Sequence, residues 1–281
     1  MPIKLTLLDA GYCLHPEHVV MRNWRWRKMR FPAMFALLEH PRFGPILFDT
    51  GYSERFFSET AHFPYSLYAK VTPVVLREEE AAIHKLARRG LAPSDIEHVI
   101  ISHFHADHVG ALCDFPKARY LYLPDAFEAV RGRRGLRAVL AGFLPGLLPP
   151  DFEQRSQTVD WAQRRLLPPA YVPFTEGVDL FGDESVMAVR LPGHATGQMG
   201  IFVQTDNSEP YFLVADACWH SHAYRQQLLP HPITNLIFSN PRLYQATLAK
   251  LHHFYCRSPN VPIIPSHCSE AHERFVVNGE G

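Results

Sequence analysis

Residues 102–110 read Ser-His-Phe-His-Ala-Asp-His-Val-Gly and directly follow a short apolar run. In an extended segment, residues two apart lie on the same side, so His103 and His105 can point at one ion. The chain must then turn, which directs Asp107 and His108 towards a neighbouring point. Imidazole is the commonest metal ligand, and nitrogen and oxygen donors without thiolate suit zinc or another borderline divalent ion. The stretch therefore predicts a metal site at the end of a strand.

Further ligand-type residues lie at the ends of other predicted strands. His194, Asp216 and His267 each follow an apolar run, so they could meet the first cluster at one edge of a sheet. Asp49 also follows a buried strand, in Asp49-Thr50-Gly51. Spacing alone leaves two interpretations of Asp49 open, as a turn former or as a group that orients a ligand.

This complete set of motifs resembles the metallo-β-lactamase superfamily, whose signature is HxHxDH followed by a histidine, a bridging aspartate and a final histidine. Asp49-Thr50-Gly51 also resembles the early aspartate-containing turn of that family. The resemblance implies an α/β fold, an αβ/βα sandwich of two mixed sheets back to back with outer helices and metals at one edge. It implies that the ligands of one ion are His103, His105 and His194, that those of the other are Asp107, His108 and His267, and that Asp216 bridges the two ions.

The chemistry expected of such a site is hydrolysis. Two divalent ions, expected to be Zn²⁺ although iron, manganese and cobalt remain open, can share a hydroxide that is available at neutral pH. We predict that this hydroxide attacks a carbonyl carbon. Asp107 would orient the nucleophile, and Asp216 would act as the second catalytic carboxylate.

Within the superfamily, HFHADHVG at residues 103–110, TGQMG at 196–200 and the chain length most resemble the N-acyl-homoserine-lactone lactonases. This implies opening of a lactone, as in quorum quenching, or cleavage of a related carboxylic ester. A glyoxalase II-like thioesterase is the alternative, because the arginine-rich segments 22–30 and 131–137 could serve an anionic substrate. A phosphodiesterase would carry more positive charge, and a non-catalytic metal-binding regulatory module would often have lost a ligand.

The chain departs from those lactonases at one position. They resemble one another in having a tyrosine three residues after the bridging aspartate, whereas this chain has Trp219. An indole N–H can donate a hydrogen bond but cannot act as a general acid near neutral pH. Trp219, His220 and His222 are candidate substrate contacts, and the two histidines can also be read as ordinary loop residues.

Composition bounds the partners and the compartment. The chain has 281 residues, with 28 basic and 28 acidic side chains, and this zero formal charge argues against a nucleic-acid binder. Five scattered cysteines without a CxxC pair are typical of reduced thiols. Neither a signal-like N-terminus nor a membrane-length apolar run is present in the sequence. We expect a cytoplasmic protein that binds a small-molecule substrate, not a membrane, and that could form a homodimer.

Residues 1–281 are expected to form a single domain with a helical insertion at about 125–170. The insertion has a proline-broken apolar centre, which suits a lid over an apolar substrate or a helical pair packed on the core or in a dimer interface. Alternating basic and aromatic residues predict a strand over 22–31. Helices are predicted over 78–89 and about 241–254, and a hairpin joins strands at 200–205 and 211–214.

Overall fold

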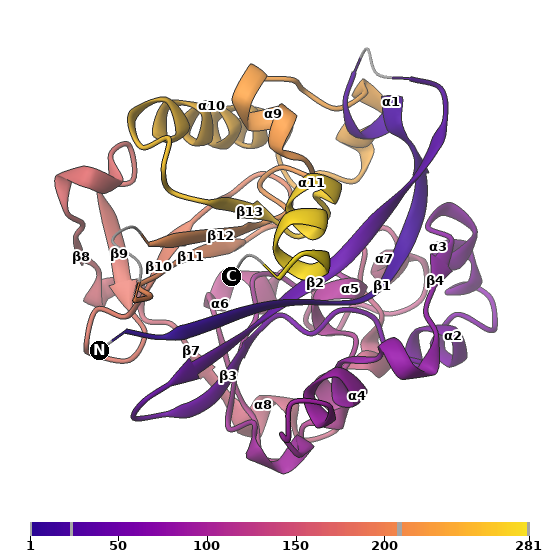
Figure 1. Ribbon diagram of the computed structural model, residues 1–281. Helices are drawn as coiled ribbons and strands as arrows, with labels where there is room; N and C mark the ends of the chain where they lie inside the picture. The colour runs from indigo at the N-terminus through magenta and orange to yellow at the C-terminus, as the bar shows by residue number, and fades with distance from the viewer. Residues whose placement is uncertain (1, 23–24, 207–209, 280–281) are drawn as a thin grey trace.

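The computed structural model describes residues 2–22, 25–206 and 210–279. Within these ranges the strands form one seven-stranded and one six-stranded sheet, and helices lie on the outside of both (Figure 1). The predicted α/β sandwich of two mixed sheets is confirmed. No helix of the described residues is both long enough and apolar enough to cross a membrane.

Each sheet is mixed: the first has three antiparallel and three parallel pairings, and the second is antiparallel except for the pairing of its last two strands along the chain. In order across the first sheet, the strands are β4 (Val74–Val75), β1 (Lys4–Pro16), β2 (Lys28–His40), β3 (Gly44–Phe48), β5 (His98–Ile100), β6 (Arg119–Tyr122) and β7 (Ser156–Thr158). In order across the second sheet, the strands are β13 (Ile263–Pro265), β12 (Tyr211–Ala215), β11 (Met199–Val203), β10 (Val186–Arg190), β9 (Glu176–Asp179) and β8 (Arg165–Leu166). Strands β3, β5, β6 and β7 run parallel, as do β12 and β13.

The α-helices in the described part of the chain are mostly short, and only one of them is longer than six residues. They are α1 (Glu17–Val20), α2 (Arg55–Glu59), α3 (Ser66–Val71), α4 (Ala82–Ala87), α5 (Ala106–Val109), α6 (Pro124–Glu128), α7 (Leu136–Val139), α8 (Phe152–Arg155), α9 (Ser221–Gln226), α10 (Pro241–Arg257) and α11 (Ser269–His272). The N-cap residue of α10 is Asn240, whose side chain accepts hydrogen bonds from two backbone amides of the first turn.

The layers follow from the alternation of side chains along each strand. Leu38 of β2 and Ile201 of β11 lie in a core between the two sheets. Their neighbours point the other way, so that Leu37 packs under the helices of the first sheet and Phe202 packs under α9 and α10. Because both faces of the central strands are covered, strands such as β11 and β12 are apolar on both sides, whereas the edge strands β7 and β8 are largely exposed.

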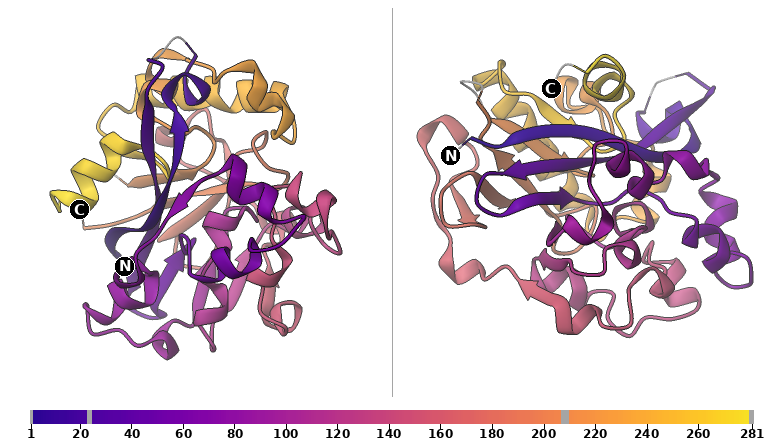
Figure 2. Two further views of the ribbon diagram at one scale, coloured as in Figure 1. Left: turned by 90° about the vertical axis from the view of Figure 1, so that its right-hand side faces the viewer. Right: turned by 60° about the horizontal axis from the view of Figure 1, so that its bottom comes forward.

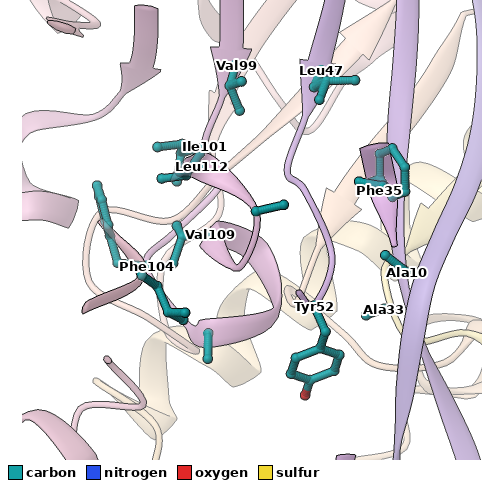
Figure 3. Packing of buried hydrophobic residues seen from close by; sticks show 14 of the residues in the cluster. Ala10, Ala33, Phe35, Leu47, Tyr52, Val99, Ile101, Phe104, Val109 and Leu112 are labelled. Carbon is teal, nitrogen blue, oxygen red and sulfur yellow. The ribbon is translucent and has the colours of Figure 1, made fainter. Parts of the chain in front are cut away.

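The outer core of the first sheet supports the metal motif. In Figure 3, Leu47 and Val99 project from neighbouring strands, and Ile101, Val109 and Leu112 lie beside them. Short helix α5 therefore rests on apolar contacts while its polar residues face away from this core.

The structure also differs from the sequence predictions at several elements. The predicted strand over 22–31 begins only at Lys28, and Asn23 and Trp24 lie outside the described residues. The short helix α1, at residues 17–20, precedes this segment and lies near the tip of the long β1–β2 hairpin (Figure 2). The predicted helix over 78–89 is divided, with a 3₁₀ turn at Glu78–Glu80 followed by α4, because Ala81 between them has extended ψ.

Other predictions are confirmed. A helix spans 241–257, and β11 and β12 form an antiparallel hairpin whose connecting residues 207–209 lie outside the described ranges. Segment 125–170 contains short helices, as expected, and in addition β7 and β8, which add one edge strand to each sheet.

Candidate metal centre

Strands from both sheets end at the same place. In the first sheet, Asp49 follows β3 and the His103–His108 motif follows its parallel neighbour β5. In the second sheet, β10 and β12 are both antiparallel to β11, so they run in the same direction, and β13 is parallel to β12. His194, Asp216 and His267 follow these three strands.

The structure brings together all seven residues predicted as metal ligands. They form three groups in which the potential ligand atoms lie within 4.8 Å of one another: His103, His105 and His194; His103, His108 and Asp216; and Asp107, His108 and His267. Because these groups share members, the seven side chains form one continuous cluster.

Asp216 lies in the middle of this cluster. Its Oδ2 is 3.2 Å from Nε2 of His194 and 3.2 Å from Nε2 of His267. Its Oδ1 is 3.3 Å from Nε2 of His108. The carboxylate thus faces both the group of three histidines and the group that contains Asp107, whose Oδ2 lies 3.0 Å from Nε2 of His267.

The donor atoms fit divalent cations. Nε2 of His103, Nε2 of His108 and Oδ1 of Asp216 are buried and have no hydrogen-bond partner among the described residues. Buried polar atoms are normally satisfied, so atoms that converge without a partner suit an ion. Nitrogen and carboxylate oxygen donors are the set that zinc and similar ions prefer.

Contacts behind two of the histidines fix which ring nitrogen faces the cluster. Nδ1 of His108 donates to Oδ2 of Asp49 at 2.7 Å, and Nδ1 of His267 donates to the carbonyl oxygen of Pro32 at 2.7 Å. Because Nδ1 carries the proton in both rings, the lone pair of each neutral ring is on Nε2, which points into the cluster.

Asp49 is a fully buried carboxylate with a strained backbone. Its φ is +60°, and its oxygens accept hydrogen bonds from the amide of Ser102 at 2.8 Å and from the hydroxyl of Ser102 at 2.8 Å, besides His108. Asp49 therefore forms a turn and also contacts a predicted ligand, so the two interpretations left open by the sequence hold together.

Side-chain hydroxyls in the turn after Asp49 bind the backbone of the metal motif. The hydroxyl of Thr50 donates to the carbonyl oxygen of His108 at 3.1 Å, and the hydroxyl of Ser53 donates to that of Gly110 at 2.5 Å. A Cβ atom on Gly110 would clash with the carbonyl oxygen of Gly51 and would lie 3.0 Å from that of Ala106. Glycine is required here because two backbone segments approach closely.

Burial and charge divide the histidines into two classes. Burial lowers the pKa of His105 to about 4 and that of His194 to about 3, so both rings are neutral and able to bind a metal at pH 7. Burial also opposes protonation of His108, but the carboxylates of Asp107, Asp49 and Asp216 outweigh it and raise the pKa of His108 well above its usual value.

The carboxylates respond in the opposite direction. Burial disfavours the ionised form of Asp107, but His108 and His267 outweigh that effect and lower its pKa to about 2. The pKa of Asp216 is lowered well below its usual value by His267, His108 and His194, again against the effect of burial. Both carboxylates are therefore ionised at neutral pH and favour a bound cation.

The three predicted substrate contacts lie in different surroundings. The indole Nε1 of Trp219 donates to Oδ2 of Asp216 at 2.9 Å, which places this ring at the cluster. Nδ1 of His220 accepts from the amide of His222 at the start of α9, and Nε2 of His220 lies 3.3 Å from the hydroxyl of Ser269. Neither His220 nor His222 lines the cavity beside the cluster.

That cavity has a volume of about 260 Å³ and opens next to His105 and His194. Its walls come from segment 126–141 and from the segment that precedes α10. The lining includes Phe104, Val130, Arg133, Leu140, Leu236 and Phe238. Gly142 packs against His105, because a Cβ there would lie 2.5 Å from Cδ2 of that ring. The inserted segment thus contacts a predicted ligand and lines the adjoining cavity, while its role as a lid stays a prediction.

Sequence reasoning missed several groups around the cluster. The carbonyl of Pro32 contacts His267, but a backbone oxygen leaves no signal in the sequence. Cys13 and Tyr52 are buried near Asp107, and burial raises the pKa of the Cys13 thiol to about 12, so it is not a thiolate. Ser102 was part of the motif, yet its two hydrogen bonds to Asp49 depend on the position of another strand.

Sequence comparisons relate the chain to known proteins. The sequence profile described as the Metallo-beta-lactamase superfamily matches residues 37–209. The chain is 27% identical over 241 residues to the N-acyl homoserine lactonase AttM of Azorhizobium caulinodans, a match that covers 81% of each chain.

Two solved structures have the same fold. One is an N-acyl homoserine lactone hydrolase with the product N-hexanoyl-L-homoserine bound at its catalytic metal center, with a TM-score of 0.68, 20% identity, and coverage of 96% of this chain and 95% of that one. The other is AidC, a dizinc quorum-quenching lactonase in complex with the same product, with a TM-score of 0.65, 16% identity, and coverage of 95% and 88%.

Proposed function

Since the matching profile spans more than half of its length, this chain belongs to the metallo-beta-lactamase superfamily, and from that premise we propose that it is a metal-dependent hydrolase that opens a lactone or cleaves a related carboxylic ester. The convergence of seven ligand-type side chains from the ends of strands in both sheets carries this proposal. The relatives whose names describe lactonases support the choice of a lactone.

We assign the cluster to two divalent cations per chain, with zinc as the preferred ion. One would be held by His103, His105 and His194, the other by Asp107, His108 and His267, with Asp216 between them. When bound, such cations polarise an ester carbonyl and make water a nucleophile at neutral pH.

The protein side chains supply orientation. Asp107 is ionised and belongs to the cluster, so its carboxylate can accept a hydrogen bond from a water that approaches the carbonyl carbon of the substrate. Asp49 and the carbonyl of Pro32 hold the Nδ1 protons of His108 and His267, so Nε2 is the nitrogen of each ring that would bind a cation. The cavity beside His105 is the proposed site of the substrate, and its apolar wall suits an uncharged acyl group.

Metal content and hydrolysis, measured on one sample, test this function. The purified protein is expected to contain close to two ions per chain and to hydrolyse lactones faster than thioesters or phosphodiesters. His105→Ala and Asp216→Ala are expected to remove metal and activity together. Full turnover by either variant would contradict the ligand assignment, and phosphodiester hydrolysis alone would contradict the substrate class.

A glyoxalase II-like thioesterase is the second candidate, and one observation favours it. Arg133 lines the cavity, whereas Arg131 in the same segment is paired with Glu128 and Glu153. A cation at the wall would attract an anionic thioester. Arg133→Gln should raise KM for an anionic thioester and leave KM for a neutral lactone unchanged if this alternative holds.

The expected compartment and assembly are also proposals. All five cysteines lie in the described ranges and are free thiols, which supports a reducing compartment such as the cytoplasm. Sedimentation of the purified protein would test the homodimer, and limited proteolysis would test whether residues 1–281 form one domain.

A further inference from the structure

We propose that Trp219 is a positioning residue for Asp216, holding that carboxylate through its indole N–H and joining the metal cluster to the wall of the cavity. The inference rests on the metal-dependent hydrolase proposed above. It concerns a position at which the resemblance to lactonases fails, so it describes a property of this chain and not of those enzymes.

The hydrogen bond is set up by a tight turn after β12. Ala215 has a positive φ of 48°, and the amide of Ala217 donates to the carbonyl of Val214 at 3.1 Å. The turn brings the side chain at 219 back over that at 216, with 2.9 Å between Nε1 and Oδ2. Oδ2 is also the oxygen that lies 3.2 Å from both His194 and His267.

The ring that carries this N–H is fixed by its neighbours. Trp219 lies edge-on to His194, with 5.6 Å between ring centroids, and tilted against Phe238 at 5.4 Å. Phe238 in turn stacks on Tyr244 with 4.2 Å between centroids. Because aromatic contacts lie on several sides of the indole, the direction of its N–H is set by packing and not by Asp216 alone.

A carboxylate oxygen can accept an indole proton and still bind a cation. Each oxygen offers about two lone-pair directions, and the indole nitrogen is a donor only, which neither ionises nor competes for the cation. The hold on Asp216 is therefore independent of pH over the working range. Losing a contact of this kind to a ligand typically costs about 10–100-fold in metal affinity or activity.

Trp219 does not line the cavity itself but contacts it through Phe238. Phe238 lines the cavity and lies 5.6 Å from His194, so Trp219, Phe238 and His194 form one aromatic unit between the carboxylate and the cavity. A substrate group that contacts Phe238 would therefore affect the position of the indole and, through its N–H, the position of Asp216.

Two replacements at position 219 separate the N–H from the ring. Trp219→Phe removes the donor and reduces the ring, while 3-benzothienylalanine at the same position keeps the bicyclic shape and puts sulfur in place of N–H. The matched control is Trp161→Phe, because Trp161 is a partly buried tryptophan that packs against Arg190 and the core between the sheets, outside the cluster. The metal-free and zinc-loaded forms of each protein are compared by thermal unfolding to verify the fold.

The main readout is zinc retention against a chelator, which does not depend on turnover. Both replacements at 219 are expected to weaken zinc binding about 10–100-fold, and Trp161→Phe to leave it unchanged. The kcat for a lactone should fall with KM little altered. Titration of metal-free protein with Co²⁺ should quench indole emission in the parent, and this component should be missing in Trp219→Phe.

Three results would overturn the proposal. The first is unchanged zinc retention in both replacements. The second is normal retention in the benzothienyl protein beside a defective Trp219→Phe, which would leave only packing. The third is a change in KM alone, which would make Trp219 merely a cavity wall. If the parent binds zinc but hydrolyses no ester, the proposed function fails while the retention experiment still decides the role of Trp219.

Discussion

Replacing Asp49 with asparagine should selectively weaken the metal group that contains His108. The wild-type carboxylate accepts three hydrogen bonds, from the Ser102 amide, the Ser102 hydroxyl and Nδ1 of His108, at 2.7–2.8 Å. An asparagine oxygen can keep the bond to the Ser102 amide, which places its NH₂ group opposite the hydroxyl and the imidazole. His108 must then accept through Nδ1, and its proton moves to Nε2.

A proton on Nε2 blocks the lone pair that faces Asp216 and the cluster. The loss of one hydrogen bond to a charged group corresponds to about 1.5–3 kcal/mol. Because about 1.4 kcal/mol is a factor of ten, zinc affinity at this group should fall about 10–100-fold. The group of His103, His105 and His194 is linked to Asp49 indirectly, through the Ser102 hydroxyl that lies 3.0 Å from Nδ1 of His103, and should keep its ion longer.

The assay is competition between metal-free protein and a chromophoric chelator, which resolves two successive binding steps. Asp49→Asn should weaken one step and leave the other within a few-fold. Asp151→Asn, which removes a surface carboxylate paired with Arg155, is the control and should bind as the parent does. If Asp49→Asn kept the parent's affinity at both steps, or weakened both steps equally, the argument from tautomers would be refuted.

Other perturbations give distinct outcomes. Gly110→Ala should reduce the free energy of unfolding by about 1–3 kcal/mol in a denaturant titration, because its Cβ meets backbone atoms that cannot move separately; stability equal to the parent would contradict this. Asp9 of β1 is partly buried and pairs with Lys85 of α4 and His272 of α11; burial raises its pKa, but these two partners outweigh that effect and lower the pKa. The contribution of Asp9 to the free energy of unfolding is present above its unfolded pKa of about 3.9 and is lost as pH falls through the folded value. Asp9→Asn should therefore cost about 1–3 kcal/mol at pH 7 and progressively less below pH 4, measured by unfolding at a series of pH values. A difference that does not depend on pH would count against the ion pair. Shortening residues 131–150 should change the preference among acyl-chain lengths more than Tm, and an unchanged preference would argue against a lid.

The arrangement of the predicted ligands followed from local patterns. Apolar runs that end in His or Asp are visible in the sequence, and the direction of parallel strands brings such ends to one edge. The role of Asp49 required the structure, because the Ser102 and His108 groups that it contacts are more than fifty residues away. The contact between Trp219 and Asp216 depends on a turn at Ala215 that no motif announced.

The errors also have local physical causes. Alternation over 22–31 predicted a strand, but Trp26 is 84% exposed and Arg27 pairs with buried Glu17 across the end of the β1–β2 hairpin. Residues 25–27 therefore belong to the end of the hairpin, whereas 28–31 lie in β2 as predicted. Strands β7 and β8 contain three and two residues, which is too short for a period of two to be recognised.

The division of the seven side chains between two sheets has a consequence for biosynthesis. The His103–His108 stretch emerges from the ribosome well before His267, which follows the last strand of the chain. A nascent polypeptide can offer at most part of the coordination shell, so tight capture of the cations must wait until the C-terminal strand has docked. The completion of folding thus sets the time of full metal uptake, and a chain interrupted before β13, which lacks His267, should lose the ion of the Asp107, His108 and His267 group more readily than the full chain.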